Sequence, residues 1–173
     1  MTFHPVRSGE NENPLMAEIS YTTGDATSPT AAGNKIICHI CNDVGGWGRG
    51  FVLAISKRWA GPEGRYRQWF ELRDGNDFGF GAVQFVQVEL ELWVANMVAQ
   101  RDVRARDGRP PIRYDAVESC LGKVADFSEE QNAGVHMPRI GCGLAGGSWA
   151  EIEPIVKRTL VDRGISVTVY DFK

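Results

Sequence analysis

Long apolar runs are absent from this 173-residue sequence, and their absence excludes two classes of protein. No stretch approaches the roughly 18 apolar residues that a membrane-spanning helix needs, and the N-terminus lacks the apolar segment of a secretory signal peptide. An excess of charge of one sign is also lacking, because 19 basic and 22 acidic residues leave a formal net charge of only -3 at pH 7. No overall field then attracts nucleic acid or anionic lipid. We expect a cytoplasmic protein without membrane contact, in which local groups hold any anionic ligand.

Cysteine and histidine are few, and their spacing does not indicate a metal centre. Cys38 and Cys41 have the C-x-x-C spacing of redox and zinc pairs. The segment KIICHICN, however, is typical of a buried strand, in which positions an odd number apart point to opposite faces. We interpret both thiols as buried structural groups. The sequence has no H-x-x-H pair and no acidic cluster, so we expect neither a metal nor a cofactor.

Length and composition predict a single domain. With 43% hydrophobic and 24% charged residues, the chain has the composition of a soluble globular protein with one sizeable core. Residues 1–15 are polar, contain proline and lack periodicity, so we interpret them as a flexible leader or as the product of an upstream start. The domain is predicted to span residues 16–173.

Strand and helix patterns alternate along this domain. The strands are predicted at 17–23, 35–41, 81–89, 92–100, 134–140 and 165–172, with a short connection between the third and fourth that favours a hairpin. The helices are predicted at 50–59, 63–75, 114–130 and 149–164, the last one opened by Ser148 as its N-cap. Such alternation predicts a layered α/β domain with a mixed sheet and helices on both faces.

Two glycine clusters each follow a strand and precede a helix: NDVGGWGRG, residues 42–50, and GCGLAGGS, residues 141–148. Ligands of open α/β sheets bind at this edge, and bare backbone N–H groups at a helix start suit phosphate oxygens. Two facing loops of this kind suit a diphosphate. Neither matches the G-x-G-x-x-G fingerprint or a P-loop, and each one alone could be a turn with tight helix–sheet packing.

Several of these motifs together resemble the macrodomain family, whose members bind ADP-ribose and its derivatives. TTGDAT resembles the family's Gly-Asp motif, and HICNDVGGWGRGFVLAISKRW resembles its first phosphate-and-ribose loop. MPRIGCGLAGGSW followed by VTVYDF resembles its second loop and final strand. The resemblance covers nearly all of 17–172 and implies a three-layer α/β/α fold, an ADP-ribose ligand and a monomer. It is nearest to the branch with terminal ADP-ribose–protein hydrolases of the glutamate-ester type and yeast-type ADP-ribose 1''-phosphate phosphatases.

The resemblance also implies ligand-binding residues. Asp25, beside Ala26, would accept the adenine amine, although a turn or cap aspartate is the alternative. Asn42 would contact the distal ribose. Trp47 would wall off that ribose or belong to the core, and Tyr170 would line the adenine or pack with its hydroxyl satisfied. The two loops would supply the remaining residues: Gly46, Gly48, Arg49, Gly50, Gly141, Cys142, Gly143, Leu144, Ala145, Gly146 and Gly147.

The family's catalytic pattern is broken in this sequence. The glutamate-ester hydrolases use a lysine after the fourth strand and an aspartate in the second loop, where this chain has Gln100 and Arg101, and Ala145. Because an arginine stays protonated, a covalent lysine-type mechanism is not expected. Attack by an oriented water is expected instead. The catalytic candidates are Asn42, Asp43, Arg49, Gln100, Arg101 and His39.

Two of these candidates have an alternative interpretation. Asp43 is the only carboxylate among them that could act as a base, yet it could equally be an inert loop residue. His39 stands in the H-x-C-N context of the phosphatases and could titrate near neutral pH, whereas a histidine in an apolar strand is more often a hydrogen-bonded core residue.

Three functions therefore stay open. The leading one is an ADP-ribosyl hydrolase that removes ADP-ribose from modified macromolecules, with glutamate or aspartate ester-linked protein favoured over nucleic acid. The rivals are a binding module without turnover and an ADP-ribose 1''-phosphate phosphatase. The loop from Arg101 to Arg113 could contact phosphates of a polymer or of DNA, or could simply be solvated.

Overall fold

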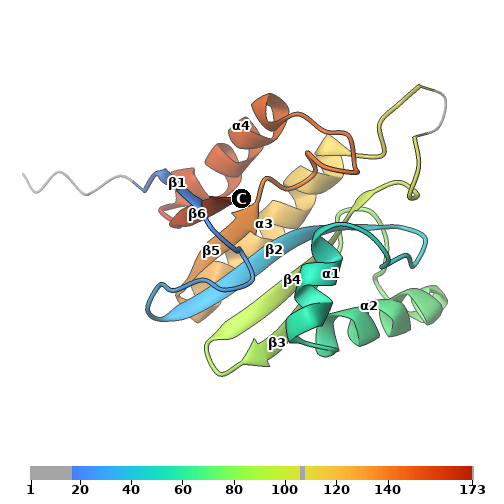
Figure 1. The fold of residues 1–173 in the computed structure, drawn as a ribbon, viewed down its shortest axis with the longest axis horizontal. Helices are drawn as coiled ribbons and strands as arrows, with labels where there is room; N and C mark the ends of the chain where they lie inside the picture. Colours follow the sequence, from blue (N-terminus) through green and yellow to red (C-terminus); the bar gives the residue numbers. More distant parts are fainter. Residues whose placement is uncertain (1–16, 106–107, 173) are drawn as a thin grey trace, which may run out of the picture.

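The computed structural model describes residues 17–105 and 108–172, and it has one central sheet flanked by helices (Figure 1). The predicted leader, residues 1–15, lies outside the described residues. The strands are β1 (Ile19–Thr23), β2 (Asn34–Asn42), β3 (Val83–Glu89), β4 (Leu92–Gln100), β5 (Ala133–Pro138) and β6 (Val167–Asp171). The helices are α1 (Phe51–Arg58), α2 (Gly61–Glu71), α3 (Tyr114–Gln131) and α4 (Trp149–Thr159), with short 3-10 helices η1 (Arg73–Gly75) and η2 (Val161–Arg163).

The six strands form a mixed sheet in the order β1-β6-β5-β2-β4-β3. Every neighbouring pair is parallel except β3 and β4, which are antiparallel and form the predicted hairpin. The predicted α/β class with a mixed sheet is therefore confirmed. Because β2, β4, β5 and β6 run the same way, their carboxyl ends meet at one edge of the sheet, where ligands of such folds bind.

Two hydrophobic clusters pack on opposite faces of the sheet. Side chains of α3 and α4 pack on one face with Ile36 and Cys38 of β2, and side chains of α1 and α2 pack on the other with Ile37 and Cys41. Cys38 and Cys41 are both buried free thiols, so the interpretation of the C-x-x-C spacing as structural is confirmed. Burial raises the pKa of both thiols, which keeps them protonated and unreactive.

Several predicted boundaries differ from the structure by a few residues. The helix predicted at 63–75 begins earlier, at Gly61, because Pro62 at its first turn fits a helix start. The helix predicted at 149–164 ends at Thr159 and continues only as η2, which Gly164 closes with a φ of 78°. Ser148 does occupy the N-cap position, but its side chain makes no capping hydrogen bond. Among the described helices, none combines the length and apolarity that crossing a membrane requires.

Candidate functional site

Three adjoining cavities form a groove along the carboxyl edge of the sheet. Cavity A, of about 320 Å³, is lined by Gly24, Asp25, Ala26, Gly50, Phe51, Ala54, Pro138, Tyr170 and Phe172. Cavity B, of about 290 Å³, is lined by Ile40, Arg49, Gly50, Phe51, Val52, Gln100, Pro138, Arg139, Ile140, Gly141, Gly143, Leu144 and Ala145. Cavity C, also of about 290 Å³, is lined by Ile40, Cys41, Asn42, Gly46, Trp47, Gly48, Arg49, Val52, Gln100, Val103 and Leu144. Because A shares residues with B, and B with C, the three are continuous.

Cavity A is an apolar slot with one carboxylate at its edge. Its walls come from the start of α1, from Pro138 and from the end of β6, where the Phe172 ring is 85% exposed. The Asp25 Oδ1 atom accepts hydrogen bonds from the Thr27 N–H at 2.8 Å and the Thr27 hydroxyl at 2.7 Å. Burial alone would raise the pKa of Asp25, but these bonds and the Arg58 guanidinium hold it below its usual value. The slot can therefore hold a flat ring with an amino group directed at a charged carboxylate.

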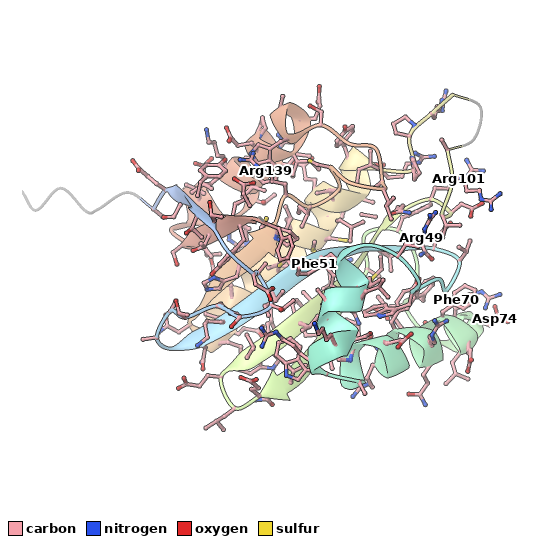
Figure 2. The ribbon with its side chains drawn as sticks, in the orientation of Figure 1. Arg49, Phe51, Phe70, Asp74, Arg101 and Arg139 are labelled. Carbon is pink, nitrogen blue, oxygen red and sulfur yellow. The ribbon has the colours of Figure 1, made fainter. Side chains whose placement is uncertain are left out.

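Cavity B lies between the two glycine loops and presents bare backbone donors. The N–H groups of Phe51 and Val52, at the start of α1, have no acceptor within residues 17–105 and 108–172. The same holds for the N–H groups of residues 143–145 in the second loop. Arg49 and Arg139 also line this cavity, and in Figure 2 the labelled Phe51 and Arg139 come from its two sides. Such a ring of N–H groups and guanidinium groups suits an anion.

Glycine is required where the first loop enters α1. Gly50 is the N-cap residue of α1 and has a φ of 81°, a conformation that residues with a side chain rarely adopt. A Cβ atom there would also lie 3.4 Å from the Leu144 Cδ1 atom of the second loop, so the two loops meet across the groove. This close approach explains why a glycine cluster precedes the helix.

Cavity C has two side-chain amides in its lining, and its thiol, Cys41, is kept protonated and unreactive by burial, which raises its pKa. Asn42 and Gln100 supply these amides, and Gln100 Nε2 donates to the Asp102 main-chain oxygen at 2.9 Å. Trp47 is only 3% exposed and donates from Nε1 to Ser56 Oγ at 2.7 Å, so it is at once a core residue and part of the lining. The residues that line cavities B and C include no lysine and no carboxylate.

Several residues predicted for the site lie outside the lining of all three cavities. Asp43 accepts a hydrogen bond on Oδ1 from the Asp102 N–H at 2.7 Å, so its carboxylate holds the loop that follows β4. Arg101 is exposed beyond the groove (Figure 2). Cys142 lies between two lining residues without lining itself. Gly147 serves loop packing, since a Cβ atom on it would lie 2.4 Å from the Gly141 oxygen, and Gly146 packs in the same way against Pro110.

His39 lies beneath the groove rather than in it. The ring is 1% exposed, and its Nε2 atom lies 2.5 Å from Asn96 Oδ1, while Nδ1 has no partner among the described residues. Burial lowers the pKa of His39 to about 4, so the ring is neutral at pH 7. It packs edge-on against Trp47 with ring centroids 5.2 Å apart. His39 can therefore influence the groove only indirectly, through lining residues that it contacts, such as Trp47 and Phe51.

Sequence reasoning did not name several residues that line the groove, among them Phe51, Arg139 and Phe172. Phe172 stands two positions after Tyr170, and the period of a strand places such a pair on one face. Phe51 begins α1 between cavities A and B. Arg139 donates two hydrogen bonds to Asp171, of 2.6 and 3.1 Å. No sequence motif predicts this ion pair. Among the described residues, no three His, Cys, Asp or Glu side chains gather as metal ligands.

Comparisons with known proteins show the family. No family model matches this sequence. The structure of a macrodomain protein from Streptomyces coelicolor is 56% identical, with a TM-score of 0.80, over 89% of this chain and 99% of that chain. A Chromodomain-helicase-DNA-binding protein 1-like from Danio rerio is 32% identical over 165 residues, and this chain covers only 16% of its length.

A third relative links the chain to an enzyme. An ADP-ribose 1''-phosphate phosphatase from Meyerozyma guilliermondii is 24% identical over 83% of this chain and 94% of that protein. The match to the Streptomyces structure is high in identity and covers nearly all of both chains. The chain therefore belongs to the macrodomain family.

Proposed function

We propose that this macrodomain binds ADP-ribose along the groove and hydrolyses the bond that joins it to modified macromolecules. One observation carries the proposal: an apolar slot, an anion-binding ring of N–H groups and a cavity with two side-chain amides follow one another in cavities A, B and C. Adenine, diphosphate and distal ribose follow one another in the same order in ADP-ribose. Because one chain lines all three cavities, we further propose that the protein acts as a monomer, and we expect it in the cytoplasm.

The bound ligand would place its reactive carbon in cavity C. Asp25 would then receive the adenine amine, and the Tyr170 and Phe172 rings would border the base. The N–H groups at the start of α1 and in residues 143–145 would receive the diphosphate oxygens. The distal ribose would lie on Asn42 between Trp47 and Gln100, with its anomeric carbon toward the open side of cavity C.

Hydrolysis in this pose would proceed by direct attack of water. The anomeric carbon of an ADP-ribose ester is already activated, so holding a water against it supplies much of the rate. Water would add to that carbon as the ester carboxylate leaves, and the diphosphate oxygens, the nearest anions in the pose, would accept its proton. Gln100 and Arg49, which line both B and C, are the side chains placed to orient this water. Glutamate and aspartate esters of protein are the favoured substrates because their carboxylate is a good leaving group.

Two other functions keep specific support. The absence of any carboxylate or lysine from the described lining of cavity C favours a binding module without turnover. The phosphatase relative favours release of phosphate from ADP-ribose 1''-phosphate. His39 gives that second alternative no help, because it is buried and does not line the cavities.

A panel of ADP-ribose conjugates tests the proposal. ADP-ribose linked through glutamate, serine, arginine and thymidine, together with ADP-ribose 1''-phosphate, is incubated with the protein, and free ADP-ribose is measured. Release from the glutamate conjugate supports the hydrolase, and release from the phosphate alone supports the phosphatase. Tight binding of ADP-ribose with no release from any conjugate supports the binding module.

A further inference from the structure

Helix α2 contacts the first glycine loop through a buried tyrosine that belongs to none of the three cavities. The Tyr66 side chain is fully buried, and its hydroxyl lies 2.9 Å from Asn42 Oδ1 and 2.7 Å from the Asn42 main-chain oxygen. Trp47 and Phe78 hold the ring, with centroids 5.4 and 6.0 Å away. Burial raises the pKa of Tyr66, so the hydroxyl keeps its one hydrogen, which it shares between the Asn42 main-chain oxygen and Oδ1.

The Asn42 amide has a single orientation because three donors surround its oxygen. Oδ1 accepts from the Val44 N–H at 3.0 Å, from the Gly46 N–H at 2.9 Å and from the Tyr66 hydroxyl. A flipped amide would direct its NH2 group at these donors, so the oxygen must stay where it is. On the other side, one Nδ2 hydrogen donates to the Gly46 oxygen at 2.8 Å. The second Nδ2 hydrogen has no acceptor in the described part of the chain, and Asn42 lines cavity C.

We propose that Tyr66 is a positioning residue that helps to fix the Asn42 amide so that Asn42 presents a hydrogen-bond donor, and no acceptor, to a ligand in cavity C. The proposal rests on the proposed function, since it concerns the distal ribose in cavity C. It adds the polarity of the contact: the ligand atom above Asn42 must be an acceptor, such as a hydroxyl or ring oxygen of the sugar. A ligand with only a donor at that point is rejected, because the amide cannot turn over to receive it.

Two further contacts show that α2 supports the same loop from outside the groove. Arg67, next to Tyr66, donates from Nη1 to the Gly45 oxygen at 3.2 Å. Phe70, one turn later, packs its ring under Gly45, where an added Cβ atom would lie 2.4 Å from it. The Arg67 and Phe70 contacts hold the loop backbone. Among these three α2 side chains, only Tyr66 forms a hydrogen bond to the Asn42 side chain. Removal of that hydroxyl should therefore affect the amide with little movement of the loop.

A pair of ligands separates this role from general support of the fold. ADP fills cavities A and B, whereas ADP-ribose also fills cavity C, so titration calorimetry with both isolates the contact in C. For Tyr66→Phe we expect ADP-ribose affinity to fall by roughly three- to tenfold, the effect of one hydrogen bond, and ADP affinity to stay within about twofold. Asn42→Asp keeps the acceptor for Val44 and Gly46 and loses the free N–H, so it should lower ADP-ribose affinity further while sparing ADP.

Ser128→Ala is the matched control for loss of a buried hydroxyl. Its hydroxyl also donates to a main-chain oxygen, that of Ala133, at the opposite edge of the sheet. This variant should leave the ratio of the two affinities unchanged. If Tyr66→Phe leaves the ratio of ADP-ribose affinity to ADP affinity unchanged, whether both fall equally or neither falls, the positioning role is overturned. If the wild-type protein binds neither ligand, the proposed function fails as well, whereas binding of both without hydrolysis removes only the hydrolase.

Discussion

Arg58 and Asp25 form an ion pair at the edge of cavity A, with Arg58 Nη2 3.3 Å from Asp25 Oδ2. The other carboxylate oxygen, Oδ1, accepts two hydrogen bonds from Thr27, so a ligand donor would share Oδ2 with Arg58. Arg58 also donates from Nε to the Thr27 hydroxyl at 2.7 Å, which ties α1 to the turn that carries Asp25. The carboxylate is thereby held in place before any ligand arrives.

Removal of this carboxylate should weaken ligand binding. We expect Asp25→Ala to reduce the binding free energy of ADP-ribose by about 1.5–3 kcal/mol, as for a hydrogen bond to a charged group. Calorimetry measures the loss. Asp74→Ala is the control, because Asp74 lies near Phe70 and away from the labelled Phe51 (Figure 2). Undiminished binding by Asp25→Ala would remove Asp25 from the adenine site.

A side chain at Gly143 should block the groove without disturbing the fold. A Cβ atom at Gly143 meets nothing within 4 Å, so the fold should accept Gly143→Val at an unchanged melting temperature. Because Gly143 lines cavity B, we expect the added side chain to obstruct this cavity and abolish ADP-ribose binding. Gly46→Val should also abolish binding, but with lower stability, because its Cβ atom would lie 3.0 Å from Asn42 Nδ2 and 3.2 Å from Val103 Cγ1. Gly79→Val, in an open loop, is the control. A folded Gly143→Val protein with full affinity would show that the second loop is merely structural.

If the protein is a hydrolase, turnover should leave no covalent adduct with the enzyme. A lysine amine would have to reach the distal ribose, and no lysine among the described residues lines cavities B or C. Borohydride added during turnover should therefore trap no protein–ADP-ribose species. Gln100→Ala should slow release by roughly tenfold or more, and more than Asp43→Ala, because only Gln100 lines the cavity. Detection of a lysine-linked adduct by mass spectrometry would contradict this mechanism.

Acid should destabilise the fold through His39. Burial lowers the pKa of His39 from 6.5 to about 4, so between these values the unfolded chain binds a proton that the folded chain does not. The free energy of unfolding therefore falls as the pH falls through this window, by up to about 3 kcal/mol. Urea unfolding at about pH 7 and about pH 4.5 measures the loss.

The variant His39→Leu serves as the reference for this pH dependence. It should be less stable at neutral pH, since Asn96 loses its partner, but its stability should change less between the two pH values. His136, whose pKa burial also lowers to about 4, remains in both proteins and cancels in the comparison. An identical loss in both proteins would show that other groups control the acid response.

The sequence predicted the elements well because each one carries its own local signal. The apolar run of β2, the glycine clusters and the period of α3 sufficed to predict the α/β class and the edge at which the loops meet. The opposite faces of Cys38 and Cys41 followed from the period of a strand alone. Helix ends were less accurate, since the end of α4 depends on the turn at Gly164.

The functions of single side chains were harder to predict, because they depend on contacts between distant segments. Asp43 and Gln100 both stand near a strand end, yet Asp102 binds the Asp43 carboxylate and leaves Gln100 on the cavity wall. In the sequence, Tyr66 occupies an ordinary apolar position of a predicted helix. Only the tertiary fold brings its hydroxyl to Asn42. The binding roles of the loop residues stay predictions until a ligand is measured.

The strand order has a consequence for how cavity A forms during folding. Among the described strands, β6 alone pairs with β1. Besides the start of α1 and Pro138, cavity A takes residues from the chain after β1 and from the end of β6, about 145 positions apart in sequence. Such distant partners meet late, after the local helices and the β3–β4 hairpin. A ligand of cavity A would then bind only to protein in which β1 and β6 have already paired. It would therefore slow unfolding of the protein but would not accelerate the earlier folding steps. A chain without β6 would leave β1 unpaired and would also lack cavity A.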